Sequence, residues 1–197
     1  PFDKYIEQIP RNGIYIIFEA GEKHKQWDRI VRVGTHTGDN QLRSRLYQHF
    51  VNKNKNRSIF RKNIGRALLN KENNPYLTIW DLDTTSRADK IKNGHLINRD
   101  FEQELEGLIS KYIQTNLSFT VFEVTNKDKR LFWESRIIST LARFSAGRPS
   151  NNWFGQFSPK DKIREYGLWQ VNELLNQPLD FEEFNDLTRL IKNNTST

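Results

Sequence analysis

Two short runs of apolar, mostly β-branched residues near the beginning of the chain predict a pair of strands. The first run covers residues 13–18 (GIYIIF), and the second covers residues 29–34 (RIVRVG). The ten residues between them are polar, and a polar connection longer than a tight turn predicts a flexible or functional loop. The pattern therefore predicts a hairpin with a long loop at its tip.

Helical periodicity follows the hairpin. Leu42, Leu46 and Phe50 recur every four residues and predict the buried stripe of a helix. Arg45 and His49 are also four residues apart, so they share a helix face next to this stripe.

The remaining patterns complete a mixed α and β chain. A second helix is predicted to begin after Ser58 as its N-cap residue. Residues 76–80 fit either a short strand or part of an insertion, and residues 81–98 are predicted to be a loop. Clearer patterns predict a helix over 99–114, a strand over 118–124, a helix over 126–142 and a last helix within 178–191.

These elements predict an α+β fold with a small, mostly antiparallel central sheet flanked by helices. The 197 residues suffice for one well-packed domain rather than two. We expect a main domain over residues 1–157, with an insertion at about 71–117. Residues 158–197 are expected to form a helical extension that packs on the same domain.

Composition narrows the class of protein. The absence of cysteine excludes a disulfide framework and thiolate zinc sites. No stretch approaches the roughly 20 apolar residues that span a bilayer, and the start of the chain lacks the order of a signal peptide. The sequence also lacks the spacings that bind nucleotides or calcium. We therefore expect a cytoplasmic protein with no membrane partner and no small-molecule cofactor.

The positive charge of the chain is concentrated in one stretch. Residues 41–70 contain no Asp or Glu, whereas the other 23 Lys and Arg residues are balanced by 24 acids. The like charges of this stretch repel one another, and such a one-sided stretch indicates that the partner is a polyanion. Its cations other than Arg45 are expected to contact the phosphates of double-stranded DNA: Arg43, Lys53, Lys55, Arg57, Arg61, Lys62 and Arg66.

The order of these parts resembles the GIY-YIG nuclease family over roughly residues 11–153. The matching parts are Gly13-Ile14-Tyr15, Arg32-Val33-Gly34 about 20 residues later, a helix with Arg45 and His49, Glu134 on a late helix, and an Asn after it. The resemblance implies a nuclease fold and hydrolysis of phosphodiester bonds. Such hydrolysis requires an activated water, neutralisation of the phosphoryl oxygens and help for the leaving oxygen.

The resemblance assigns two charged residues to the phosphate. It implies that Glu134 holds a single Mg²⁺, for which Mn²⁺ can substitute, beside the leaving oxygen. Apolar neighbours surround Glu134 in the sequence, and a carboxylate there is costly unless it is paired or bound to a metal. Arg45 would hold the scissile phosphate because its fixed fork of donors matches two oxygens.

Two further residues would handle the proton of the attacking water. By resemblance Tyr15 helps to deprotonate the water, which requires nearby cations or the metal. His49 takes the place of a family Tyr or His and could act as general base or orient the water.

The family Asn and the second tyrosine are less direct to assign. The Asn is either Asn151 or Asn152, and we favour Asn152, which would orient the active-site helix. Where the second motif has Tyr, this chain has Arg32, which could pair with a phosphate or with Glu134. His36 could replace the missing polar ring, and Lys23 or Lys25 could supply a cation near Tyr15.

The sequence therefore predicts a Mg²⁺-dependent endonuclease of double-stranded DNA, of which a type II restriction-type enzyme is one form. A palindromic target would require a homodimer. The alternative, motivated by Arg32, is a nucleic-acid-binding protein that keeps the fold but has lost catalysis.

Overall fold

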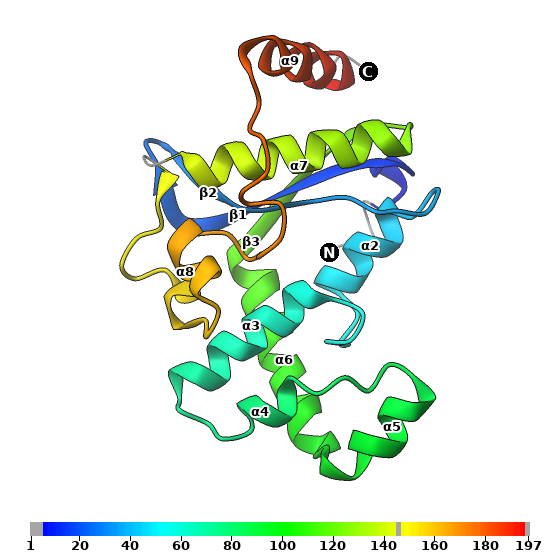
Figure 1. Cartoon of the computed structure of the whole chain (residues 1–197), viewed down its shortest axis with the longest axis vertical. Coiled ribbons are helices and arrows are strands. Elements are labelled where there is room, and N and C mark those ends of the chain that lie inside the picture. The colour runs from blue at the N-terminus through cyan, green and yellow to red at the C-terminus, as the bar shows by residue number, and fades with distance from the viewer. Residues whose placement is uncertain (1–5, 145–146, 196–197) are drawn as a thin grey trace.

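A three-stranded antiparallel sheet forms the centre of the molecule (Figure 1). The computed structural model describes residues 6–144 and 147–195. The strands are β1 (Gly13–His24), β2 (Trp27–Gly34) and β3 (Leu117–Glu123), in the order β2-β1-β3. The sheet and its flanking helices confirm the predicted α+β class.

Most of the chain outside the sheet is helical. In chain order, the helices of the described residues are η1 (Ile6–Gln8), α2 (Leu42–Phe50), α3 (Ile59–Lys71), α4 (Leu77–Trp80), α5 (Arg87–Asn93), η2 (Gly94–Leu96), α6 (Arg99–Asn116), α7 (Lys127–Arg143), η4 (Phe154–Phe157), α8 (Asp161–Tyr166) and α9 (Phe181–Thr195). Within these described parts, every helix is too short or too polar to span a lipid bilayer.

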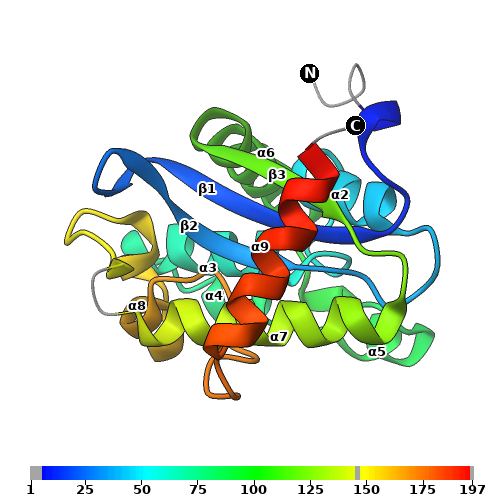
Figure 2. The same ribbon diagram turned by 90° about the horizontal axis from the view of Figure 1, so that it is seen from above.

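The sheet separates two apolar cores. Tyr15 and Ile17 of β1 belong to the core formed with α2, α3 and α6, whereas Ile14 belongs to the core formed with α7 and α9. Figure 1 shows α7 and α9 above the sheet and α3 and α6 below it, and Figure 2 shows α9 crossing over α7. Because both faces of β1 are covered, its apolar run is continuous rather than alternating.

The hairpin of β1 and β2 is longer than predicted. The loop expected over residues 19–28 is wrong, because β1 continues to His24 and only Lys25 and Gln26 connect it to β2. The polar residues continue the strand because Glu19 and Glu22 are buried and hydrogen-bonded. Glu19 accepts bonds from the indoles of Trp153 and Trp169, at 2.9 and 3.1 Å.

β2 contains a β-bulge next to Arg32. Ile17 pairs with Arg32 and Phe18 pairs with Ile30, which leaves Val31 as the extra residue. Arg32 lies opposite Ile17, two residues from Tyr15 along β1, so it lies on the same face of the sheet as Tyr15.

The segment between α3 and α6 also differs from its prediction. Residues 77–80 form α4 rather than a strand, and Trp80 packs so closely on Gly65 that a Cβ there would lie 2.5 Å from the indole. Part of the predicted loop over 81–98 is helical, because the Ser86 hydroxyl caps α5 by accepting from the Asp89 amide. The prediction that α3 begins after Ser58 is confirmed, since the Ser58 side chain accepts from the Arg61 amide.

Candidate active site

Tyr15 and His49 form a buried hydrogen-bonded pair. Tyr15 Oη lies 2.8 Å from His49 Nε2, and the two side chains are 1% and 0% exposed. Gly34 faces Tyr15 on β2, and a Cβ at Gly34 would lie 2.2 Å from the Tyr15 hydroxyl. The glycine of the second motif therefore makes room for the tyrosine of the first.

The environment of His49 keeps its ring neutral. Burial lowers the pKa of His49 well below its usual value, and the charges of Arg32, Arg45 and Arg61 lower it further. The Nδ1 atom of His49 lies 2.7 Å from the Ser58 hydroxyl. With Nδ1–H facing Ser58, Nε2 accepts from the Tyr15 hydroxyl, which in turn accepts from Arg32 Nε.

This neutral, buried histidine predicts a loss of stability in acid. Since the folded pKa lies below the unfolded value of about 6.5, the unfolded state binds more protons there and the free energy of unfolding falls as the pH drops below about 6.5. A His49→Gln variant, measured by urea denaturation between pH 7.5 and 5, should lose less stability than wild type over this range.

Other titrating groups affect both proteins equally. The lowered pKa of His36 makes the free energy of unfolding fall in acid in both proteins. Glu134 changes the free energy of unfolding in the opposite direction, because burial raises its pKa. This effect is also the same in wild type and in the His49→Gln variant. The exposed His95 provides the control variant His95→Gln, whose slope should equal that of wild type.

Arg32 is an internal residue of the site. It is 6% exposed, donates from Nε to the Tyr15 hydroxyl at 3.4 Å and from a terminal nitrogen to the Trp169 carbonyl at 2.7 Å. Its guanidinium also lies over the Phe60 ring at 5.1 Å. In the described residues it forms no ion pair with Glu134, although its charge lowers the pKa of that carboxyl. The arginine that replaces the second tyrosine thus contacts the first.

Glu134 lies where β2 ends. Its Oε1 atom accepts from the Thr35 amide at 3.0 Å, and the Thr35 hydroxyl donates to the Gly13 carbonyl at 2.6 Å. Burial raises the pKa of Glu134, as does the nearby carboxylate of Glu173, whereas the Thr35 amide, Arg32 and Arg45 lower it. Thr35 therefore fixes the carboxylate against the start of β1.

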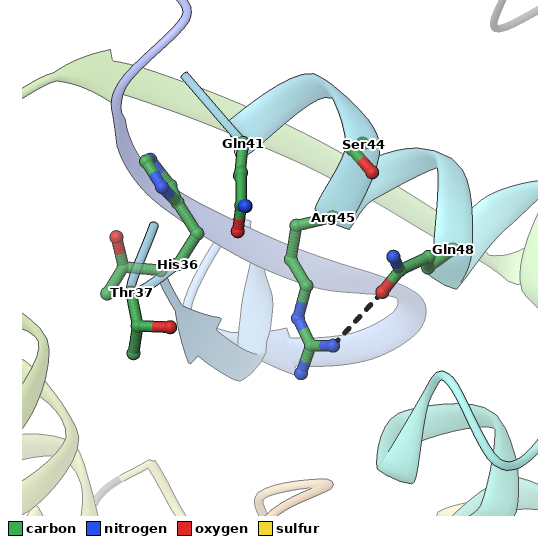
Figure 3. Close-up of a pocket in the computed structure, with 7 residues that line it drawn as sticks. His36, Thr37, Gln41, Ser44, Arg45 and Gln48 are labelled. Atoms are coloured by element: carbon green, nitrogen blue, oxygen red, sulfur yellow. Dashed lines mark hydrogen bonds between the residues drawn. The ribbon is translucent and has the colours of Figure 1, made fainter. Parts of the chain in front are cut away.

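Arg45 lines an open pocket beside Glu134. The pocket has a volume of about 270 Å³, and Thr35 forms part of its wall. Figure 3 shows Arg45 and Gln48 among the residues that line it. Arg45 donates to the Arg57 carbonyl at 3.1 Å and to Gln48 Oε1 at 3.3 Å. Within the described residues it has no acidic partner, which leaves its charge for an anion.

His36 has no free ring nitrogen. Nε2 accepts from the Gly13 amide at 3.3 Å, and Nδ1 faces the Gly38 carbonyl at 2.6 Å, to which it donates. Burial lowers the pKa of His36, and the charge of Arg130 lowers it too, so the ring is neutral. The structure uses His36 to hold the turn after β2 on the start of β1, rather than as a ring beside Tyr15.

The structure does not bring Asn152 to the other candidates. Asn151 and Asn152 are exposed, while their neighbours Ser150 and Trp153 bind Glu22 and Glu19. Glu22 lies seven residues beyond Tyr15 on β1, or roughly 23 Å at about 3.3 Å per residue. Lys23 and Lys25 lie at the same distant tip, where Lys23 pairs with Asp28 at 2.5 Å.

Half of the cations in residues 41–70 are paired with acids from other parts of the chain. The ion pairs are Arg43–Glu7, Lys55–Glu102, Arg61–Glu106 and Arg66–Asp81. Lys55, Arg61 and Arg66 are buried at 4%, 0% and 8% exposure, which corrects the expectation that they contact phosphates. Lys62 is half-buried against the Asp81 carbonyl, so only Lys53 and Arg57 of the seven expected contacts are fully exposed.

The sequence patterns missed a segment that lies beside β2. The Trp169 amide donates to the Val31 carbonyl at 2.7 Å, and Gln170 Oε1 accepts from the Val33 amide at 3.0 Å. The segment continues to Glu173, whose Oε2 and the Ser135 hydroxyl both accept from Asn176 Nδ2. The pair Leu168-Trp169 after Gly167 was the available signal, since two large apolar residues following a helix stop favour docking on a core.

The donor set suits a hard divalent cation. Among the described residues no group of three or more His, Cys, Asp and Glu side chains could enclose a metal ion. Glu134 contributes one carboxylate oxygen beside an open pocket, and Mg²⁺ is commonly held by one or two carboxylates, waters and substrate phosphates. The residues therefore fit Mg²⁺ or Mn²⁺ better than zinc, which prefers enclosed nitrogen and sulfur ligands.

Comparison with known proteins gives one match. A family model described as the GIY-YIG domain matches residues 3–197, which is nearly the whole chain. Comparisons with curated proteins and with solved structures give no significant match. GIY-YIG nucleases generally use a divalent metal, and their substrate is nucleic acid. The chain belongs to the GIY-YIG domain family, a family of nucleases.

Proposed function

We propose that this protein is a Mg²⁺-dependent endonuclease that hydrolyses phosphodiester bonds of double-stranded DNA. The observation that carries the proposal is the position of Thr35. Its amide donates to Glu134, and the same residue lines the pocket that Arg45 lines. Gly34, the last residue of the same strand, pairs with Tyr15 of β1. A phosphate in the pocket would therefore meet the cation of Arg45, and the carboxylate of Glu134 lies directly behind Thr35, which forms part of the pocket wall.

Arg45 would hold the scissile phosphate. Its planar donors match two phosphate oxygens, and the charge persists at any working pH. Gln48 Oε1 and the Arg57 carbonyl both accept from the same terminal nitrogen, Nη1, and so orient the guanidinium before the substrate binds. The exposed side chains of Lys53 and Arg57 would contact phosphates further along the duplex.

Tyr15 and His49 would handle the proton of the attacking water. Tyr15 would accept this proton as it gives its own proton to Nε2 of the neutral His49. Arg32 faces the same hydroxyl and would stabilise negative charge that develops on it. Ser58 would hold the His49 ring in place throughout.

Glu134 would hold the divalent cation. When bound, Mg²⁺ or Mn²⁺ would supply positive charge beside the leaving 3′ oxygen. The half-buried, hydrogen-bonded position of Glu134 presents its carboxylate without a lysine or arginine ion pair among the described residues.

A restriction-type role is the finer form of the proposal. Hydrolysis of both strands at a palindromic site would require two copies of the chain related by a twofold axis. The part of the structure between α3 and α6 would then be one source of further DNA contacts.

Removal of the metal tests the proposal directly. The purified chain should convert supercoiled plasmid to nicked and linear forms in Mg²⁺, and an excess of EDTA should abolish this conversion. Added Mg²⁺ or Mn²⁺ should restore it. Tight binding of duplex DNA without any cleavage in either metal would contradict the proposal and favour a binding protein that has lost catalysis. Competition by double-stranded RNA at fixed salt tests the substrate class.

A further inference from the structure

One face of α2 presents a stripe of polar side chains to the pocket. Gln41, Ser44, Arg45 and Gln48 follow one another at spacings of three, one and three residues, which places them on the same side of a helix. All four line the pocket of about 270 Å³, and Figure 3 shows them facing Thr37 and His36 across it. Gln41 and Ser44 precede Arg45 in the stripe and Gln48 follows it. The stripe therefore extends along the helix on both sides of the proposed phosphate position.

The stripe is almost uncharged. Apart from Arg45 it consists of two amides and a hydroxyl, and the facing wall consists of Thr35, Thr37 and the neutral His36. Neither the Gln41 amide nor the Ser44 hydroxyl has a side-chain hydrogen bond within the described ranges. Gly38 leaves the space that the Gln41 amide occupies, since a Cβ there would lie 2.5 Å from Gln41 Nε2. The chain therefore exposes unpartnered donors and acceptors at this place.

This chemistry differs from that of a phosphate site. Phosphate oxygens only accept hydrogen bonds, so Ser and Gln side chains can donate to them, but the acceptor oxygen of the Gln41 amide would have no partner on a phosphate. The edges of bases present both donors and acceptors, and Gln and Ser side chains are among those that read them. With Arg45 occupied by the scissile phosphate, the remaining groups of the pocket match the edge of a base.

We propose that Gln41, Ser44 and Gln48 contact the base edges next to the scissile phosphate and determine which bases the enzyme accepts there. The inference rests on the proposed nuclease function, because Arg45 fixes the register of the duplex against α2. Gln41 and Ser44 carry the test, since Gln48 also orients Arg45.

A randomised duplex tests the proposal with two readouts. Wild type, Gln41→Ala and Ser44→Ala are each given a library with random bases around one site, and the ends of cleaved molecules are sequenced. In parallel, duplexes retained by each protein without metal are sequenced. Wild type should discriminate among bases beside the cut, and each variant should reduce that discrimination at one position by about tenfold. Matched controls are Gln103→Ala on α6 and Ser118→Ala on β3, both exposed and outside the pocket, which should keep the wild-type preference.

The other outcomes overturn the inference. A uniform loss of affinity for all sequences, with an unchanged salt dependence because neither side chain is charged, would mean that the stripe contacts only the backbone. Unchanged base preference in the variants, or no preference beside the cut in wild type, would also refute it. Absence of cleavage by wild type would refute the proposed nuclease function alone, because the retained duplexes still report whether Gln41 and Ser44 select bases.

Discussion

A Glu134→Gln variant should bind duplex DNA but cleave it about 10²- to 10³-fold more slowly than wild type in Mg²⁺, the cost expected when an aimed electrostatic group is lost. Glutamine can still accept from the Thr35 amide, so the position of α7 against β2 should be kept. It cannot supply the negative charge that a divalent cation requires. Single-turnover cleavage of a labelled duplex measures the effect.

The control for this variant is Glu165→Gln, which removes one exposed carboxylate from α8 and should cleave as wild type does. Isothermal titration with Mn²⁺ should show weaker binding to the Glu134 variant than to either other protein. Full cleavage by the Glu134 variant would show that the metal is held elsewhere.

An Arg61→Ala variant should lose about 3–5 kcal/mol of unfolding free energy, the cost typical of removing one partner of a buried ion pair. The Arg61 guanidinium is 0% exposed and binds Glu106, the Ser110 hydroxyl and the His49 carbonyl. Burial raises the pKa of Glu106, and the charge of Arg61 lowers it. Without Arg61, Glu106 would be left buried and uncompensated between α3 and α6.

Urea denaturation of three variants separates basic residues that stabilise the fold from those that contact phosphates. The variants are Arg61→Ala, Arg57→Ala and the double variant Arg61→Met, Glu106→Leu. The replacement of the exposed Arg57 by alanine should change the free energy of unfolding by no more than about 0.5 kcal/mol. It should, however, lower the affinity for DNA. The double variant should be more stable than Arg61→Ala because no charge remains unpaired. Stability of Arg61→Ala equal to wild type would place Arg61 among the phosphate contacts instead.

The strong local patterns of the sequence predicted the main elements correctly. The stripe of Leu42, Leu46 and Phe50, the Ser58 cap and the apolar runs of β1 and β2 each express a rule that acts over a few residues. The long hairpin could not be predicted in this way, because Glu19 and Glu22 resemble loop residues in the sequence, and their hydrogen-bond donors Trp153, Trp169 and Ser150 come from distant positions.

The candidate site was predictable only where local spacing decides it. Arg45 and His49 follow from one helix, but the burial of Lys55, Arg61 and Arg66 depends on acids that lie 15 to 47 residues further along the chain. Arg32 shows the same limit. Its partner, the Trp169 carbonyl, is a backbone atom 137 residues away and carries no signal in the sequence.

The contact between Arg32 and Trp169 also bears on when the site is assembled during synthesis. Tyr15, Arg45, His49 and Glu134 are all translated before the segment that holds Arg32 in place. Pairing across 137 residues is a late event in folding, since long loops must close before it forms. A nascent chain on the ribosome therefore carries the candidate side chains without their finished arrangement, and the proposed site is complete only after Trp169 has emerged.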